Sequence, residues 1–241
     1  MAEVAWQIAD WKVEVRAAVE YLMRDYPWLT LLHYDCGGES RRDKITMSDL
    51  GRATLFGAFR GWQAAASLMH AADATNWPSG DSDWNLAAAP WADHAEWLSR
   101  KDVREARALF SSLARGDSGG WREAATSKIL HLKWPEFFPI IDGQLRTLYS
   151  ESAMKAERRI PASRRRSHAS TTGYWLAVRQ DLLRANNQEA DEATRASLMS
   201  EQGRNPDKVA RLTGLSRLRL LDALAWAVAS AKLPTVPTPA T

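Results

Sequence analysis

The sequence predicts an all-α fold, and three observations support this. Apolar residues recur at spacings of three and four along several segments, which is the period of an amphipathic helix. The composition is that of a globular protein, with 45% apolar and 25% charged residues. A capping-box pattern, "TMSD" at Thr46–Asp49, marks one helix start. We therefore expect a helical bundle in which residues 1–241 form one domain.

The first half of the chain predicts three helices and two interruptions. Residues 3–24 predict a helix, because six apolar residues share one face: Val4, Ile8, Trp11, Val15, Val19 and Leu22. Residues 28–34, "WLTLLHY", could form a short strand. The capping box begins a helix that extends to Phe59, and another helix covers residues 61–72. Two prolines and scattered Asp, Asn and Ser residues predict a loop over residues 73–93.

The second half predicts a succession of helices. They cover residues 101–114, 121–133, a segment that begins after Asp142, 172–185, 190–201, 206–212 and 216–231. The Pro- and Thr-rich tail, residues 235–241, is expected to fray. We expect two lobes, approximately residues 1–100 and 101–234.

Charge is distributed unevenly. Residues 1–120 carry a net charge of −4 and residues 121–241 a net charge of +7. The basic excess is greatest in "MKAERRIPASRRR", and its cations are Lys155, Arg158, Arg159, Arg164, Arg165 and Arg166. Such a cluster is an electrostatic signature of phosphate binding and predicts a DNA-binding segment. A solvated linker explains the same charges equally well.

Several function classes are poorly supported. The chain lacks the glycine-rich phosphate-binding motifs, the zinc-protease motif and the nucleophile-elbow motif. Its histidines show no metal-ligand spacing, and the single cysteine, Cys36, excludes an internal disulfide. We expect no metal and no cofactor. No signal peptide or membrane-spanning run is present, so we expect a cytoplasmic monomer without a membrane partner.

The segment "SKILHLKWPEFFPIIDGQL", residues 127–145, is the most unusual part of the chain. A helix over residues 128–134 would span about 10 Å, and an extended return over residues 135–141 could reach roughly 23 Å. This length allows Lys128 and Asp142 to meet. Spacing alone favours a simpler reading, in which Asp142 only caps the next helix and Lys128 faces solvent.

Three motifs carry a resemblance to a known family. They are "ITMSDLGR" (residues 45–52), the segment of residues 127–145, and "LSRLRLLDALAWA" (residues 215–227). Together they resemble the helix-hairpin-helix DNA glycosylase superfamily, in its 8-oxoguanine DNA glycosylase-like branch, and especially poorly characterised bacterial relatives, some of which are thought to act against phages with modified DNA. The resemblance implies a two-lobed helical fold, a catalytic aspartate at Asp142 and a catalytic lysine at Lys128. The family's hairpin is degenerate here, because "REAAT" (residues 122–126) replaces its glycines.

The expected function is excision of a damaged or modified base from double-stranded DNA, either an oxidised purine or a phage-type modified cytosine. A carboxylate stabilises the positive charge that develops on the sugar. Lys128 could act as a nucleophile, with associated abasic-site lyase activity, if its pKa were lowered. A non-catalytic nucleic-acid-binding module and a protein-interaction component of a defence system are the alternatives.

Four further side chains are candidates for substrate binding. Trp77 and Trp84 lie in a polar loop and could stack on a flipped base, although packing of the loop onto the body is an alternative. His131 follows Lys128 by one turn and could contact substrate or be a structural histidine. Arg146 follows Asp142 by one turn and could reach a phosphate or pair with Asp142.

Overall fold

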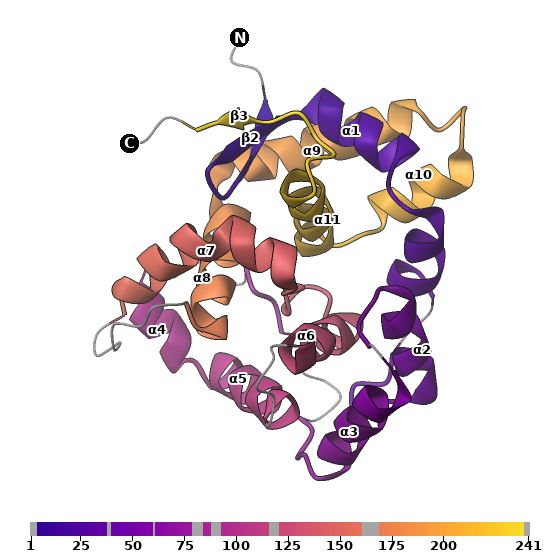
Figure 1. The fold of residues 1–241 in the computed structure, drawn as a ribbon. Coiled ribbons are helices and arrows are strands. Elements are labelled where there is room, and N and C mark those ends of the chain that lie inside the picture. The colour runs from indigo at the N-terminus through magenta and orange to yellow at the C-terminus, as the bar shows by residue number, and fades with distance from the viewer. Residues whose placement is uncertain are drawn as a thin grey trace.

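The computed structural model describes residues 4–37, 40–59, 61–78, 84–87, 93–115, 121–160 and 169–238. Helices dominate these residues, and one small sheet of three strands lies near the two termini (Figure 1). The prediction of a mainly helical protein is confirmed. The all-α class needs one correction, which is the sheet.

The sheet replaces the first half of the helix that was predicted over residues 3–24. Strands β1 (Ala5–Ile8) and β2 (Trp11–Glu14) form an antiparallel hairpin, and helix α1 (Val15–Arg24) follows directly. The hairpin turns at Ala9, whose φ of 51° is outside the helical region. Side chains at alternate positions, Trp6 and Ile8, are fully buried, as the two-residue period of a strand requires.

The predicted frayed tail is partly ordered. Strand β3 (Val236–Pro237) pairs with β2, and the Thr238 amide donates to the Asp10 carbonyl at 2.8 Å. The prediction of a frayed segment is therefore wrong for these residues, while residues 239–241 lie outside the described ones. The pairing with β2 supplies the hydrogen bonds that composition could not reveal.

The next elements follow the sequence pattern more closely. A π-helical segment, η1 (Thr30–Asp35), stands where a short strand was considered. Helix α2 (Met47–Leu55) begins with the predicted capping box, in which Thr46 and Asp49 exchange hydrogen bonds. It ends before Phe59 because the chain turns at Gly57, whose φ of 69° suits glycine. Helix α3 is Trp62–Asp73, and a short helix not predicted, α4 (His94–Ser99), follows.

All the helices predicted in the second half are present. They are α5 (Lys101–Ala114), α6 (Trp121–Lys133), α7 (Gly143–Arg158), α8 (Thr171–Leu183), α9 (Ala185–Ser200), α10 (Pro206–Thr213) and α11 (Arg217–Ala229). Helix α9 begins five residues earlier than expected. Side-chain caps at Asp142, Ser170, Asn205 and Ser216 mark four of the starts.

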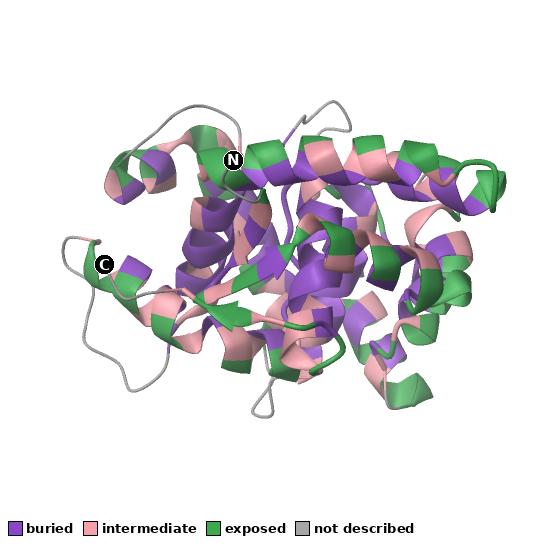
Figure 2. Ribbon diagram, turned by 90° about the horizontal axis from the view of Figure 1, so that it is seen from above, coloured by how far each residue is buried: buried purple, intermediate pink, exposed green. Residues whose placement is uncertain are grey.

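Packing joins the two ends of the chain. Strand β1 and helix α1 pack on α9, while α11 packs on α7 and α8. Helix α6 lies between α5 and α2. Figure 2 shows buried residues on the inward faces of the helices and exposed residues on their outer faces. The buried apolar side chains form one cluster, and the division into lobes at residue 100 stays a prediction.

The return from α6 to α7 is anchored in this core. Phe137 and Phe138 are fully buried and pack edge-on against Trp175 of α8. Trp134, at the end of α6, is also buried. The aromatic pair therefore holds the segment that precedes Asp142. Among the described residues, no helix has both the length and the apolar character needed to cross a membrane.

Candidate functional site

Two side chains fix the backbone immediately before Asp142. The Ile141 amide donates to the Ser127 hydroxyl at 3.0 Å, and the Ile140 amide donates to the Asp222 carboxylate at 3.0 Å. Burial raises the pKa of Asp222 to about 7. Ser127 on α6 and Asp222 on α11 thus hold the return segment between their helices, and the start of α7 is placed by both.

Asp142 is the N-cap of α7, as predicted. One carboxylate oxygen accepts hydrogen bonds from the amides of Gln144 and Leu145, at 3.1 and 3.0 Å. These bonds satisfy two of the free donors at the helix start and orient the carboxylate. The side chain is half-buried and also lines a cavity, so it is placed to contact a bound molecule as well as to cap the helix.

The cavity beside Asp142 has a volume of about 190 Å³ and a largely aromatic wall. Its aromatic lining residues come from three separate parts of the chain: Tyr21, Tyr26, Phe56 and Trp226. Asp142 and Arg219 are its acidic and basic lining residues. Burial raises the pKa of Tyr21, which also lines it, to about 12. A small, apolar, half-enclosed space with one carboxylate and one guanidinium suits a flat heteroaromatic ligand.

The Lys128 ammonium lies behind the Phe56 wall. It donates to the carbonyls of Phe56 and Gly57, at 2.9 and 3.4 Å, and stands 5.1 Å from the Phe56 ring centroid. Lys128 is buried, seven residues inside α6, so the reading that it faces solvent is wrong. Burial lowers the pKa of Lys128, and the charge of Asp142 opposes that shift.

The structure therefore brings Lys128 and Asp142 within electrostatic range without joining them. Within the described residues, the hydrogen bonds of the ammonium go to the two carbonyls and not to Asp142. Asp142 lines the cavity, whereas Lys128 is not among its lining residues. The carboxylate can reach a ligand in this cavity, and the amine is separated from it.

Arg219 closes the inner end of the cavity. Its guanidinium donates to Asp35 at 2.6 Å and to the Tyr26 hydroxyl at 2.5 Å, and it lies 5.0 Å from the Phe56 ring centroid. The Tyr34 ring stacks on the Phe56 ring, with 4.5 Å between the two ring centroids. These buried contacts join α11, η1 and the end of α2 in one wall.

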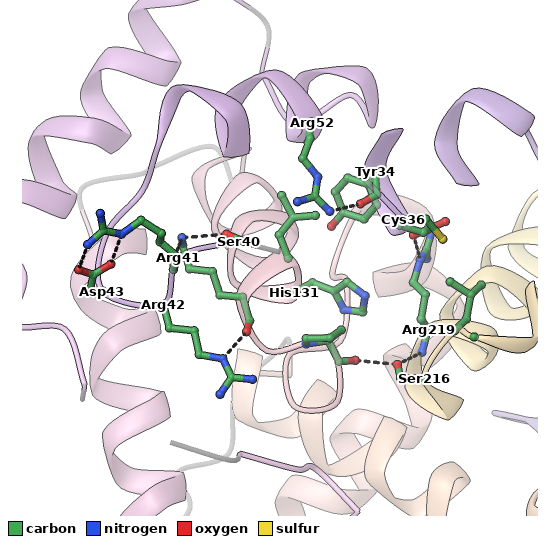
Figure 3. A pocket seen from close by; sticks show the side chains of 16 residues that line it. Tyr34, Cys36, Ser40, Arg41, Arg42, Asp43, Arg52, His131, Ser216 and Arg219 are labelled. Atoms are coloured by element: carbon green, nitrogen blue, oxygen red, sulfur yellow. Dashed lines mark hydrogen bonds and ion pairs between the residues drawn. The ribbon is translucent and has the colours of Figure 1, made fainter. Parts of the chain in front are cut away.

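A wider cavity of about 900 Å³ lies on the far side of this wall (Figure 3). Its cations are engaged by the protein itself. Arg41 forms an ion pair with Asp43, and Arg52 donates to the Tyr34 carbonyl at 2.6 Å. Arg219, which lines both cavities, is paired with Asp35. The arrangement is that of a stabilised junction between segments.

The two candidate tryptophans pack on the body of the protein. Trp84 is 5% exposed and stacks on Trp134 at 4.7 Å, so it is part of the core. Trp77 is half-buried, and its indole N–H donates to the Ala72 carbonyl at 3.1 Å. Neither lines the cavity beside Asp142. These contacts favour the packing alternative for both.

His131 and Arg146 have defined partners within the protein. The His131 Nδ1–H donates to the Phe138 carbonyl at 2.7 Å, and burial lowers the pKa of this histidine to about 3, so it is neutral. Arg146 forms an ion pair with Glu123 and not with Asp142. Its guanidinium also lies 5.1 Å from the Tyr174 ring centroid.

The basic segment begins at the opposite end of α7 from Asp142. Lys155 forms an exposed pair with Glu151 at 2.8 Å, and Arg158 and Arg159 are exposed. The helical rise places them about 20–25 Å from Asp142 along the helix axis. Arg164, Arg165 and Arg166 lie outside the described residues.

Sequence reasoning missed most of the cavity wall. Tyr21, Tyr26, Phe56 and Arg219 were not selected, because aromatic and basic residues on helix faces are ordinarily core or surface. A usable signal did exist for two residues. Arg219 and Trp226 both belong to the motif of residues 215–227.

Among the described residues, no cluster of three or more His, Cys, Asp or Glu side chains is arranged to hold a metal.

Comparison with known proteins places the chain in one family. Neither the curated proteins nor the solved structures include a match to it. A family model described as "Family of unknown function (DUF6308)" matches residues 15–229, which include every residue of the Asp142 cavity. The protein belongs to this family.

Proposed function

We propose that the protein is a DNA glycosylase, in which Asp142 acts on a nucleotide whose base enters the aromatic cavity. One observation carries the proposal: an oriented carboxylate lines a small cavity walled by four aromatic side chains. A base that leaves the duplex stack needs such a pocket, because stacking on aromatic rings offsets the lost base stacking.

The geometry suits stabilisation of a developing cation. Cleavage of an N-glycosidic bond builds positive charge on the sugar, and a carboxylate at its face lowers the energy of that state. The Asp142 carboxylate is oriented by two backbone amides at the start of α7, where the helix dipole favours negative charge. The same carboxylate can orient the attacking water.

Lys128 has a supporting role in this proposal. Its ammonium is bound by two carbonyls behind the cavity wall, so attack on the sugar would require those bonds to break. Through these bonds it holds the chain that follows α2. We infer a monofunctional enzyme that uses water and not an amine.

The placement of the three motifs supports the resemblance to helix-hairpin-helix glycosylases. Asp49 of the first motif pairs with Lys133 of the second at 3.0 Å. Asp222 of the third accepts from Ile140 of the second, and Trp226 lines the cavity with Asp142. The third motif thus meets the second beside Asp142, and the first motif meets the second at the end of α6. The superfamily fold, and a role in repair or in phage defence, stay part of the proposal.

The test is release of free base from a panel of duplex DNAs. The panel contains undamaged DNA, DNA with oxidised purines, and phage-type DNA with modified cytosines, and mass spectrometry identifies any base released. We expect release from one class. Asp142→Asn should reduce it by about 10³-fold or more, because the variant loses the charge that stabilises the transition state.

The substitution is chosen to keep the fold. Asparagine caps a helix as well as aspartate does, so thermal stability should change little. Asp93→Asn makes the same change at the cap of α4, which does not line the cavity, and serves as the control. Normal turnover by Asp142→Asn would overturn the mechanism. Salt-sensitive DNA binding with no base released from any substrate would favour the non-catalytic module.

A further inference from the structure

A third cavity, of about 490 Å³, lies between α5 and the start of α8. Apart from one carboxylate, its polar side chains are three arginines, three hydroxyl residues and one tryptophan. They are Arg104, Arg107, Arg115, Ser111, Thr171, Thr172 and Trp175. Its single carboxylate, Glu123, is already bound by Arg146 and by the Thr171 hydroxyl. The cavity therefore offers positive charge and more hydrogen-bond donors than acceptors.

Trp175 gives an independent sign of an absent ligand. The residue is 1% exposed, and its indole N–H has no hydrogen-bond partner among the described residues. Its ring is held edge-on by Phe110, at a centroid distance of 5.4 Å. An indole nitrogen can only donate, and a buried donor without an acceptor is costly. The wall of this cavity therefore contains a buried donor that an acceptor would satisfy.

The arginines are available for the same ligand. Within the described part of the chain, the side chains of Arg107 and Arg115 take part in no ion pair or hydrogen bond. Arg104 donates to the Ser99 carbonyl. Three guanidiniums against one engaged carboxylate leave a positive field in the cavity. An acceptor-rich anion such as a phosphate group matches this donor set.

The cavity is joined to the Asp142 site by direct contacts. Glu123 lines it and pairs with Arg146, which lies one helical turn, or about 6 Å, beyond Asp142 on α7. Tyr174, on α8, donates from its hydroxyl to the Arg146 carbonyl at 3.2 Å. The starts of α6, α7 and α8 therefore meet between the two cavities.

We propose that this cavity binds a phosphodiester of the DNA strand that carries the excised base. The part of the proposal that names DNA rests on the proposed function. The bound phosphate accepts from the Trp175 indole and the arginines, and it fixes the strand a short distance from Asp142. The contact comes from α5 and α8 and not from the degenerate hairpin before Lys128.

The test compares DNA affinity across a salt series for four proteins. They are the wild type, Arg107→Ala/Arg115→Ala, Trp175→Phe and Arg16→Ala, with thermal denaturation as the check of folding. Arg16 is an exposed arginine on α1, which lies at the opposite end of the molecule from α5 (Figure 1). The double variant should bind unmodified duplex about ten-fold or more weakly, with a salt slope reduced by about one to two. Trp175→Phe should weaken binding less, and Arg16→Ala should match the wild type.

Two results would overturn the proposal. One is unchanged affinity and salt slope in the double variant. The other is a double variant that no longer binds inorganic phosphate in calorimetry but binds DNA as the wild type does. That result would mean that the cavity is a site for a free anion. The proposed function fails separately: Arg107-dependent DNA binding without base release would retain this site and reject the glycosylase.

Discussion

Helix α6 carries two buried lysines, and their surroundings differ in one decisive respect. Lys133 forms a direct ion pair with Asp49 at 3.0 Å, and its ammonium also donates to the Arg41 and Lys44 carbonyls, each at 2.5 Å. Lys128, five residues earlier, donates to two carbonyls, and its nearest functional carboxylate, Asp142, is left to line a cavity.

The difference separates a carboxylate that is paired within the protein from one that is open to a cavity. The charges of Lys133 and Asp49 are cancelled within the protein, so neither is available to a ligand. The charges of Lys128 and Asp142 interact without a hydrogen bond between the two side chains, so the Asp142 carboxylate can face a bound ligand. Two buried lysines on one helix thus have different settings: Lys133 is paired with a carboxylate, and Lys128 lies near a carboxylate that stays open to a cavity.

The largest expected effect on folding is at the structural pair. Asp49→Ala leaves the Lys133 ammonium buried without its carboxylate and removes one half of the capping box. We expect the free energy of unfolding to fall by about 3–5 kcal/mol, as for other broken buried pairs. Urea denaturation measures it. Asp43→Ala, which removes an exposed carboxylate from the same segment, should change stability far less.

The same pair predicts a pH dependence. Burial acts to raise the pKa of Asp49, but the hydrogen bond from Ser40 and the charge of Lys133 outweigh it, so the net pKa is lowered. The stability that Asp49 contributes is therefore present above the unfolded pKa near 3.8 and is lost as the pH falls through the lower, folded value. Equal acid sensitivity of the wild type and Asp49→Ala would contradict the assignment.

A smaller effect on stability is expected at Lys128. Lys128→Met removes the ammonium and leaves two carbonyls without a donor, which should cost about 1–3 kcal/mol of stability. Base release should persist, slowed by about ten-fold, because Asp142 still lines the cavity. Borohydride should trap no covalent complex between the wild type and DNA. A trapped complex that disappears in Lys128→Met would show that the amine is the nucleophile.

The contrast along α6 also explains what could be predicted from the sequence. The bounds of α5 and α6 and the cap at Asp142 follow from local signals, which are apolar period, turn residues and a capping side chain. The partners of Lys128 and Lys133 do not, because their acceptors come from residues about 70–90 positions away. A lysine on a helix gives no local sign of which carboxylate it meets.

The helix predicted over residues 3–24 was wrong for the N-terminal hairpin because distant residues decide its structure as well. The Ala9 amide donates to Asp181 at 2.7 Å, and the Gln7 amide donates to Asn187 at 2.5 Å. The Trp6 indole donates to Thr194 at 3.0 Å. These buried partners on α8 and α9 hold residues 5–14 as strands, although the spacing of their apolar residues favours a helix. Tertiary contacts also built the aromatic cavity, whose wall joins Tyr21 near one end of the chain to Trp226 near the other.

The smallest expected effect on stability is at Tyr21, where the cavity itself can be tested. Its hydroxyl is buried and has no hydrogen-bond partner among the described residues. Tyr21→Phe removes a desolvated polar group, so stability should stay within about 1 kcal/mol of the wild type or rise slightly. If the hydroxyl contacts the flipped base, release should slow by about ten-fold, the equivalent of one hydrogen bond.

Tyr149→Phe is the matched control for this last variant. The Tyr149 hydroxyl donates to Asp181 at 2.9 Å, outside the Asp142 cavity. Its loss should cost about 1–3 kcal/mol of stability and leave base release per folded molecule unchanged. The two tyrosines should therefore respond in opposite ways, one in activity and the other in stability. A stability loss in Tyr21→Phe as large as that in Tyr149→Phe, with unchanged base release, would mean that the Tyr21 hydroxyl serves the fold and that the cavity does not recognise its ligand through it.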